Sequence, residues 1–145
     1  MRRQLPIEEV APLLAAPKCA TLATYRRDGT VLLSPVWHEW RDGSFTVVIP
    51  EGDMKARHIE RDPHVSIVVA ENALPNRGIE VRGEAKKVAL DIPKVIHRMA
   101  VRYLGAELAD AFVAAYTEIP CVSLRIEPGE LRVWDFADEV WTLDS

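Results

Sequence analysis

Two Asp-Gly dipeptides, at residues 28–29 and 42–43, constrain the fold of this 145-residue chain more than any other feature. Asp-Gly adopts the positive φ angles of tight hairpin turns, and each pair lies between runs rich in β-branched and apolar residues. Pro35 falls inside one run, and because proline cannot donate a ladder hydrogen bond, we expect an edge, a bulge or a break there. The pattern predicts a meander of three antiparallel strands, at residues 18–25, 30–40 and 44–49.

The remaining residues alternate between helical and strand periodicity. Apolar residues recur at helical spacing in residues 7–15 and 91–116, and Gly105 is expected to divide the second stretch into two helices. Residues 53–62 predict a short helix that is capped by Asp53. A chain of this length is near the usual size of one domain, so we expect a single, mainly β domain over residues 1–145 with flanking helices. Further strands are predicted at residues 64–69, 78–90, 122–126 and 131–136.

Charge and hydropathy limit the partners. The net charge is −4 and the pI is near 5.6, which is unlike the basic surface of a general nucleic-acid binder. No stretch approaches the roughly 18–20 uncharged apolar residues of a membrane span, and the first residues do not form a signal peptide. We therefore expect a cytoplasmic protein. Cys19 and Cys121 stand far apart, without metal-ligand spacing, and are interpreted as small core residues.

A group of cations follows the third predicted strand. Lys55, Arg57 and Arg61 fall within the short helix that starts after Gly52. A strand end, a glycine turn and a helix start favour anion binding, because the first backbone N–H groups of a helix are unsatisfied. On an ideal helix Lys55 and Arg57 point about 200° apart, so if both bind one phosphate, one of them acts from the irregular first turn. The alternative is that the cations form the solvated face of the helix.

The segment Ser34-Pro35-Val36-Trp37 is a second candidate for ligand contact. The proline leaves backbone groups free to meet a planar ring, and Trp37 offers an aromatic wall, although the same residues also fit a core and edge role. No metal site is expected, because the four histidines show no zinc-ligand spacing. Hydrolase, nucleotide-triphosphatase and dinucleotide motifs are also absent from the sequence.

In their order along the chain, five segments resemble the pyridoxamine 5′-phosphate oxidase-like, flavin-binding split-barrel superfamily. They are residues 20–24, 28–29, 34–37, 52–66 and 78–85. The Lys-x-Arg-x-Ile-x-Arg-Asp-Pro pattern at residues 55–63 is more similar to the coenzyme F420 (deazaflavin)-dependent reductases than to the FMN-dependent oxidases. The resemblance implies an antiparallel split β-barrel that forms a homodimer, with two cofactor sites at the subunit interface.

The resemblance also implies the cofactor-binding residues. Lys55 and Arg57 would hold the phosphate of the cofactor, with Met54 and His58 nearby. The ring system would be lined by Ser34, Pro35, Val36 and Trp37, and bordered by Val48, Ile49 and Pro50. Asn76 and Arg77 would approach from the loop before residue 78. Many relatives carry Ser or Thr one or two places before the lysine, where this chain has Asp53 and Met54, and the Asp53 carboxylate would repel a phosphate unless it turns away to cap the helix.

The implied activity is that of an oxidoreductase in which F420 donates hydride to an unsaturated small-molecule substrate. The protein then has to hold the ring against the substrate and exclude water. The catalytic residues are unknown, and the proton could come from solvent, Tyr25 or His38. Two alternatives stay open: an FMN-dependent oxidoreductase on the same fold, and a non-catalytic protein that binds a flavin, a deazaflavin or haem.

Overall fold

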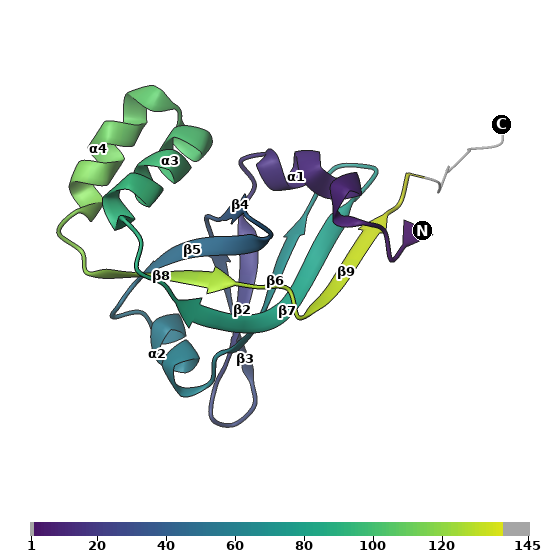
Figure 1. The fold of residues 1–145 in the computed structure, drawn as a ribbon, viewed down its shortest axis with the longest axis horizontal. Helices are drawn as coiled ribbons and strands as arrows, with labels where there is room; N and C mark the ends of the chain where they lie inside the picture. The colour runs from purple at the N-terminus through teal and green to yellow at the C-terminus, as the bar shows by residue number, and fades with distance from the viewer. Residues whose placement is uncertain (1, 138–145) are drawn as a thin grey trace.

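The computed structural model describes residues 2–137, and its central feature is a curled antiparallel sheet flanked by helices (Figure 1). The strands are β1 (Arg2–Arg3), β2 (Ala20–Tyr25), β3 (Val31–Val36), β4 (Glu39–Arg41), β5 (Ser44–Pro50), β6 (His64–Ala70), β7 (Gly78–Lys87), β8 (Cys121–Ile126) and β9 (Glu130–Asp135). The helices are the 3-10 helix η1 (Ile7–Val10), α1 (Ala11–Ala15), α2 (Met54–Arg61), α3 (Ile92–Leu104) and α4 (Ala106–Tyr116). The sequence predicts this mainly β architecture.

The long strand β7 joins the two halves of the sheet. The strand order is β3-β2-β6-β7-β8-β5-β4, with β9 and then β1 branching from β7, and all the pairs are antiparallel. Residues 78–82 of β7 pair with β9, whereas residues 85–87 pair with β8. Because β7 changes partner along one edge, the sheet curls into a split barrel.

Gly83 lies where β7 changes partner, and its lack of a side chain is required there. A Cβ at Gly83 would lie 2.2 Å from the carbonyl oxygen of Glu127, in the turn between β8 and β9. The Gly129 N–H donates to the carbonyl oxygen of Arg82 at 2.9 Å and fixes the same turn against β7. Two backbones can approach this closely only because one of them carries a glycine.

Both Asp-Gly turns form hairpins, but the predicted three-stranded meander is wrong. Gly29 closes the β2–β3 hairpin with φ +84°, and Asp42 and Gly43 close the β4–β5 hairpin with φ 51° and 74°. Residues 30–40 are not one strand, because the chain breaks between β3 and β4 at Trp37 and His38. The strands β3 and β4 consequently lie at opposite ends of the strand order.

Pro35 lies in β3, whose described ladder partner is β2 alone, so the expectation of an edge position is confirmed. The break at Gly105 is also confirmed: this residue has φ +90° and separates α3 from α4. The expectation for the two cysteines is wrong, since Cys19 is exposed and Cys121 only half-buried.

The core lies against the sheet and takes side chains from both halves of it. A buried Val, Leu, Ile or Phe side chain stabilises the fold by roughly 1.5–3 kcal/mol. Helix α1 closes the core on one side, and α1 and α2 lie on opposite sides of the strands in the view of Figure 1. The largest fully buried apolar side chains include Leu22, Phe45, Ile49, Ile67, Ile79 and Leu124.

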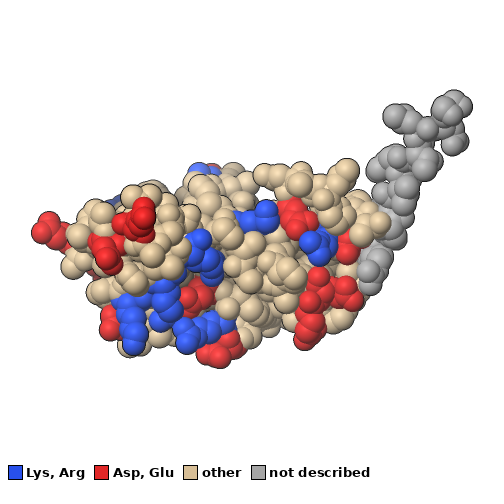
Figure 2. Space-filling view, turned by 90° about the horizontal axis from the view of Figure 1, so that it is seen from above, with Lys and Arg blue, Asp and Glu red and all other residues tan. Residues whose placement is uncertain are grey.

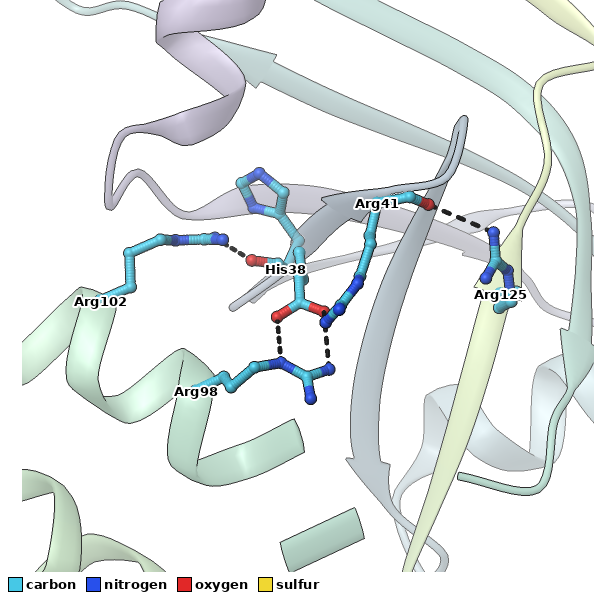
Figure 3. A network of polar contacts seen from close by, with 6 residues as sticks. His38, Arg41, Arg98, Arg102 and Arg125 are labelled. Carbon is cyan, nitrogen blue, oxygen red and sulfur yellow. Dashed lines mark hydrogen bonds and ion pairs between the residues drawn. The ribbon is translucent and has the colours of Figure 1, made fainter. Parts of the chain in front are cut away.

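The helical pair α3–α4 projects from one end of the sheet and is tied to it by a polar network (Figures 1 and 3). Arg98 of α3 donates two hydrogen bonds to the Glu39 carboxylate, at 2.9 and 3.1 Å. Burial raises the pKa of Glu39, but the hydrogen bonds and charge of Arg98 outweigh it and hold that pKa below its ordinary value. Arg102 donates to the carbonyl oxygen of His38. These contacts fix α3 beside β4.

On the face shown in Figure 2, Lys and Arg side chains lie close to Asp and Glu side chains, so charges of the two signs are mixed. Such mixing agrees with the modest net charge of −4. None of the helices within residues 2–137 is long and apolar enough to cross a membrane.

Candidate functional site

The start of α2 positions the side chains that the sequence singles out. Strand β5 ends at Pro50, the Asp53 N–H donates to the Pro50 carbonyl oxygen at 3.2 Å, and the helix begins at Met54. Asp53 occupies the cap position, but its side chain makes no cap hydrogen bond. Its carboxylate instead accepts from the Lys55 ammonium. The predicted cap position is therefore confirmed, but without a capping hydrogen bond from the side chain, and the Asp53 carboxylate faces the lysine that we expect to bind an anion.

Lys55 and Asp53 line a pocket of about 440 Å³ between the sheet and the helices, which we call the aromatic pocket. Its wall brings together the end of β3, the end of β5, the start of α2, and one side each of α3 and α4. The lining residues are Pro35, Val36, Trp37, Val48, Ile49, Pro50, Asp53, Lys55, Ile96, Met99, Phe112 and Tyr116.

Trp37 stands in a row of four aromatic rings that extends from α3 to α4. It stacks on Tyr103 with ring centroids 4.7 Å apart, and its centroid lies 4.8 Å from that of Phe112. Phe112 in turn stacks on Tyr116 at 4.6 Å. Each such pair contributes roughly 0.5–1.5 kcal/mol beyond the burial of area. Because Tyr103 and Phe112 both contact the indole, Trp37 is less free to stack on a ligand than the sequence suggests.

His38 follows Trp37 in the chain but does not line the aromatic pocket. Its ring is fully buried, and its Nδ1 lies 3.0 Å from the Tyr103 hydroxyl, which donates to the Lys18 carbonyl oxygen at 2.7 Å. Its Nε2 has no hydrogen-bond partner among the described residues. Burial, followed by the positive charge of Arg102, lowers the pKa of His38 to about 4. The ring is thus neutral at pH 7 and supports the fold next to the pocket.

Another face of α2 lines a second concavity of about 470 Å³, which we call the arginine hollow. Of the residues expected near a cofactor phosphate, Met54, Arg57 and His58 lie here rather than with Lys55. The His58 Nδ1 lies 3.0 Å from the Thr24 hydroxyl, and this side chain is only 4 % exposed. The other lining residues are Arg26, Arg27, Asp28 and Arg61. The structure therefore does not bring Lys55 and Arg57 to one pocket.

Ser34, Asn76 and Arg77 line neither of these concavities. Ser34 pairs with Leu22 inside the β2–β3 ladder. Asn76 and Arg77 belong to the loop after β6, whereas α2 precedes β6, so the strand separates them from Lys55. Arg77 there forms an ion pair with Glu71 at 3.1 Å.

The sequence does not predict that four of the lining residues belong to the site. They are Ile96, Met99, Phe112 and Tyr116. They follow the helical period that predicts α3 and α4, and Phe112 and Tyr116 are one turn apart on α4. Helical periodicity shows that such side chains share a face, but it does not show that the face covers a pocket. Within the described residues, no three His, Cys, Asp or Glu side chains are grouped to hold a metal ion.

The curled antiparallel sheet, the flanking helices and the pocket between them define a protein of the flavin-binding split-barrel class. A family model for pyridoxamine 5′-phosphate oxidase matches residues 6–135. The chain belongs to this family. No protein of curated function matches it in sequence.

Solved structures of the same class match most of the chain. A conserved hypothetical protein from Mycobacterium tuberculosis is 25% identical with a TM-score of 0.77, over 97% of this chain and 93% of that one. An F420 reductase is 26% identical with a TM-score of 0.65, over 83% of this chain and 93% of its own. The haem storage protein of Vibrio cholerae is 21% identical with a TM-score of 0.68, over 88% and 93% of the two chains, and shares the fold.

Proposed function

We propose that this protein is a cytoplasmic, homodimeric oxidoreductase that binds coenzyme F420 in the aromatic pocket and transfers hydride to an unsaturated small molecule. One observation carries the proposal: the pocket gathers residues expected around a cofactor from three separate elements. They are Pro35, Val36, Trp37, Val48, Ile49, Pro50 and Lys55. The 26% identity with an F420 reductase supports the same cofactor, and FMN is the alternative.

The lining of the pocket fits a planar ring that carries an anionic group. Most of the lining side chains are apolar or aromatic, and Lys55 contributes an ammonium at the start of α2. Lys55 is only 17% exposed. A mainly apolar cavity with a few convergent polar groups is the usual form of a cofactor site, and its volume of about 440 Å³ lies in the usual range.

The bound cofactor would supply the hydride chemistry, and the residues of this chain would bind and orient it. Lys55 would attract the anionic end of the ligand to the first turn of α2. Phe112 and Tyr116 would cover the ring and exclude water, since α3 and α4 form the outer wall of the pocket. Tyr25 and His38, considered above as proton donors, do not line the pocket.

The first test is to measure binding of F420 and of FMN, separately, by ultrafiltration and absorbance. We expect F420 to bind more tightly, and Lys55→Ala to weaken binding by about 10- to 100-fold, as expected for losing one charge-assisted contact. Lys86→Ala is the matched control, because Lys86 lies on β7 outside the pocket. If neither cofactor binds, or if both variants bind like the unmodified protein, the assignment of the pocket is wrong.

Turnover distinguishes an enzyme from a binding protein. The reduced cofactor that binds should be mixed with a panel of conjugated enones and the loss of reduced cofactor followed by absorbance. Oxidation that depends on both substrate and protein, and that falls in Lys55→Ala, supports the reductase. Tight binding without oxidation across the panel would favour a storage or shielding role on the same fold.

A further inference from the structure

Another concavity, which we call the α1 pocket, lies between η1 and α1 on one side and β4 and α3 on the other. Its volume is about 480 Å³, within the usual range for small-molecule sites. It shares no lining residue with the aromatic pocket or the arginine hollow. Its walls are mostly apolar and include Ile7, Ala11, Leu14 and Trp40, with Arg102 and Glu8 as the two charged members.

Arg102 is the cation of this pocket, and its charge has no counter-ion in the part of the chain that the structure describes. It forms no ion pair there within 4.0 Å. Its Nη2 donates to two neutral groups, the His38 carbonyl oxygen and the Tyr103 hydroxyl. Its buried Nε has no hydrogen-bond partner among residues 2–137. The guanidinium is thus charged and only partly satisfied, a state that an anionic ligand would relieve.

The preceding arginine on α3 shows what Arg102 lacks. Arg98 lies one helical turn earlier and binds the Glu39 carboxylate through two hydrogen bonds, at 2.9 and 3.1 Å. Figure 3 shows both arginines projecting from the same helix, with only Arg98 reaching that carboxylate. The Glu39 carboxylate also lies 3.8 Å from Arg41, so two cations already share it. Arg102 therefore remains open to a carboxylate from outside the chain.

Two further ionisable groups near Arg102 leave its charge in place. The His38 ring is neutral at pH 7, because burial and the charge of Arg102 lower its pKa to about 4. Glu8 lines the pocket, but it is exposed on η1 and lies more than 4.0 Å from the guanidinium. Its negative charge would repel a second anionic group on a ligand. The pocket therefore favours a ligand with one negative charge over a ligand with two.

We propose that the α1 pocket is a second ligand site, which takes a small monocarboxylic acid with an aromatic or branched apolar body. The carboxylate would pair with Arg102, because a planar guanidinium presents parallel N–H donors that match two carboxylate oxygens. The body would pack against the Trp40 indole, which meets Phe45 edge to face at 4.8 Å, and against the aliphatic side chains of η1 and α1. This inference goes beyond the proposed redox function, since no residue of the α1 pocket lines the aromatic pocket.

The test uses benzoate as the probe, titrated into the full-length protein by calorimetry at pH 7.5 and constant ionic strength. Benzamide has nearly the same shape without the charge, and phthalate carries a second carboxylate. We expect benzoate to bind at least about tenfold more tightly than benzamide, and more tightly than phthalate. Failure of benzoate to bind, or equal binding of benzoate and benzamide, would overturn the proposal.

Arg102→Gln should weaken benzoate binding by at least about tenfold and leave the binding of benzamide unchanged. Arg125→Gln is the matched control. Arg125 also donates to backbone carbonyl oxygens, those of Arg41 and Asp42, but it lies on β8 and does not line the α1 pocket. Equal loss of benzoate binding in the two variants would show that Arg102 is not the group that binds the acid.

A second variant blocks the pocket without touching α3, because Arg102 also holds that helix in place. Ala11→Trp puts a large ring at an exposed position that lines the pocket, and it should abolish benzoate binding. Ala114→Trp adds the same ring at an exposed position of α4 outside the pocket and should bind benzoate unchanged. Benzoate binding that persists in Ala11→Trp would place the acid elsewhere.

One further arm separates this site from the redox function. Lys55→Ala should leave benzoate binding intact, and Ala11→Trp should bind F420 and FMN as the unmodified protein does. Benzoate binding tests the α1 pocket even if neither cofactor binds, so the two proposals can fail independently. Displacement of benzoate by a cofactor, together with its loss in Lys55→Ala, would place the acid in the aromatic pocket and contradict a separate site.

Discussion

At the residue scale, the Asp53 carboxylate competes with any anionic ligand for the Lys55 ammonium. Their side chains are in contact, so the ammonium is already paired in the chain alone. Asp53 is 38% exposed and Lys55 17%, which places the carboxylate closer to solvent and the ammonium deeper in the pocket. A phosphate that approaches Lys55 must displace the Asp53 carboxylate or accept its repulsion. These charge interactions are stronger in the pocket than at an open surface, because water screens them less.

Asp53→Asn is therefore expected to tighten binding of the phosphate-bearing cofactor. Removing the charge frees Lys55 while keeping the shape of the side chain, and a gain of about 1 kcal/mol corresponds to about fivefold. Ultrafiltration with F420 and FMN measures it. The double variant Asp53→Asn/Lys55→Ala should show no such gain over Lys55→Ala, because the effect acts through the lysine. Unchanged or weaker binding by Asp53→Asn would contradict this account.

The sequence predicts the placement of Lys55 better than that of its neighbours. A cation at a helix start after a strand is a local arrangement, and it is found here beside a pocket. The Nδ1 of His58 meets Thr24, which is 34 residues away, and no local pattern contains such a contact. Lys55 and Arg57 separate because α2 is regular from Met54 onward, so the divergence of an ideal helix applies to them in full.

At the scale of elements, the crossing of β7 by the β8–β9 turn determines the shape of the sheet. The turn passes so close to Gly83 that a methyl group there would overlap the Glu127 carbonyl oxygen. That oxygen belongs to the backbone and cannot move aside as the end of a flexible side chain would. The barrel opens at this point, because β7 pairs with β9 before Gly83 and with β8 after it.

Gly83→Ala is expected to lower the free energy of unfolding by more than about 2 kcal/mol, since the backbone on one side of the crossing must shift. Gly52→Ala is the matched control, because a Cβ at Gly52 meets no atom within 4 Å. Urea unfolding at pH 7.5 gives both values. Equal stability of the two variants would show that the crossing can relax around a methyl group.

The positions of helices and strands along the chain are easier to predict from the sequence than the way these elements pack against one another. Turn residues and periodicity located both hairpins and the break at Gly105, since these depend on φ angles and local spacing. The predicted meander is wrong because an apolar run in the sequence does not show where a strand ends. Here the chain leaves the β3 ladder at Trp37, whose ring packs against Tyr103 and Phe112. The helices α3 and α4 were expected, but their role as a wall of the aromatic pocket depends on tertiary contact.

At the scale of the whole molecule, the exposed edge strand β3 offers a surface for a second copy. Val31 is 42% exposed and Leu33 is 65% exposed on this strand. Large apolar side chains on an unpaired edge favour association unless something covers them. The proposed homodimer would cover them next to the aromatic pocket, because Pro35 and Val36 continue the same strand into its lining.

Leu33→Lys is expected to weaken the dimer by at least about tenfold, since a buried leucine contributes roughly 1.5–3 kcal/mol. Size-exclusion chromatography with light scattering over a dilution series measures the change. Leu108→Lys provides the comparison, because Leu108 is 57% exposed on α4, away from β3. A dimer that survives Leu33→Lys but dissociates in Leu108→Lys would place the interface on the helices instead.

Stability against acid should depend on His38. Its pKa is about 4 in the folded chain against an ordinary value of 6.5, because it is buried beside the positive Arg102. Well above pH 6.5 the ring is neutral in both the folded and the unfolded chain, so it does not change the free energy of unfolding with pH. As the pH falls from 6.5 toward 4, the unfolded chain takes up the proton and the folded chain resists it, so stability declines.

From pH 7.5 to pH 5 this single group should lower the free energy of unfolding by about 2 kcal/mol. His38→Gln cannot bind the proton, so its urea-unfolding free energy should fall less over that range, whatever the substitution costs at pH 7.5. His64→Gln serves as the comparison, because the pKa of His64 shifts in the opposite direction. Hydrogen bonding to Asp62 raises the pKa of His64 in the folded chain. Protonated His64 therefore stabilises the fold below pH 6.5, and this stabilisation is lost as the pH rises through the folded-state pKa. A pH profile of His38→Gln parallel to that of the unmodified protein would mean that this ring takes up its proton without unfolding the chain.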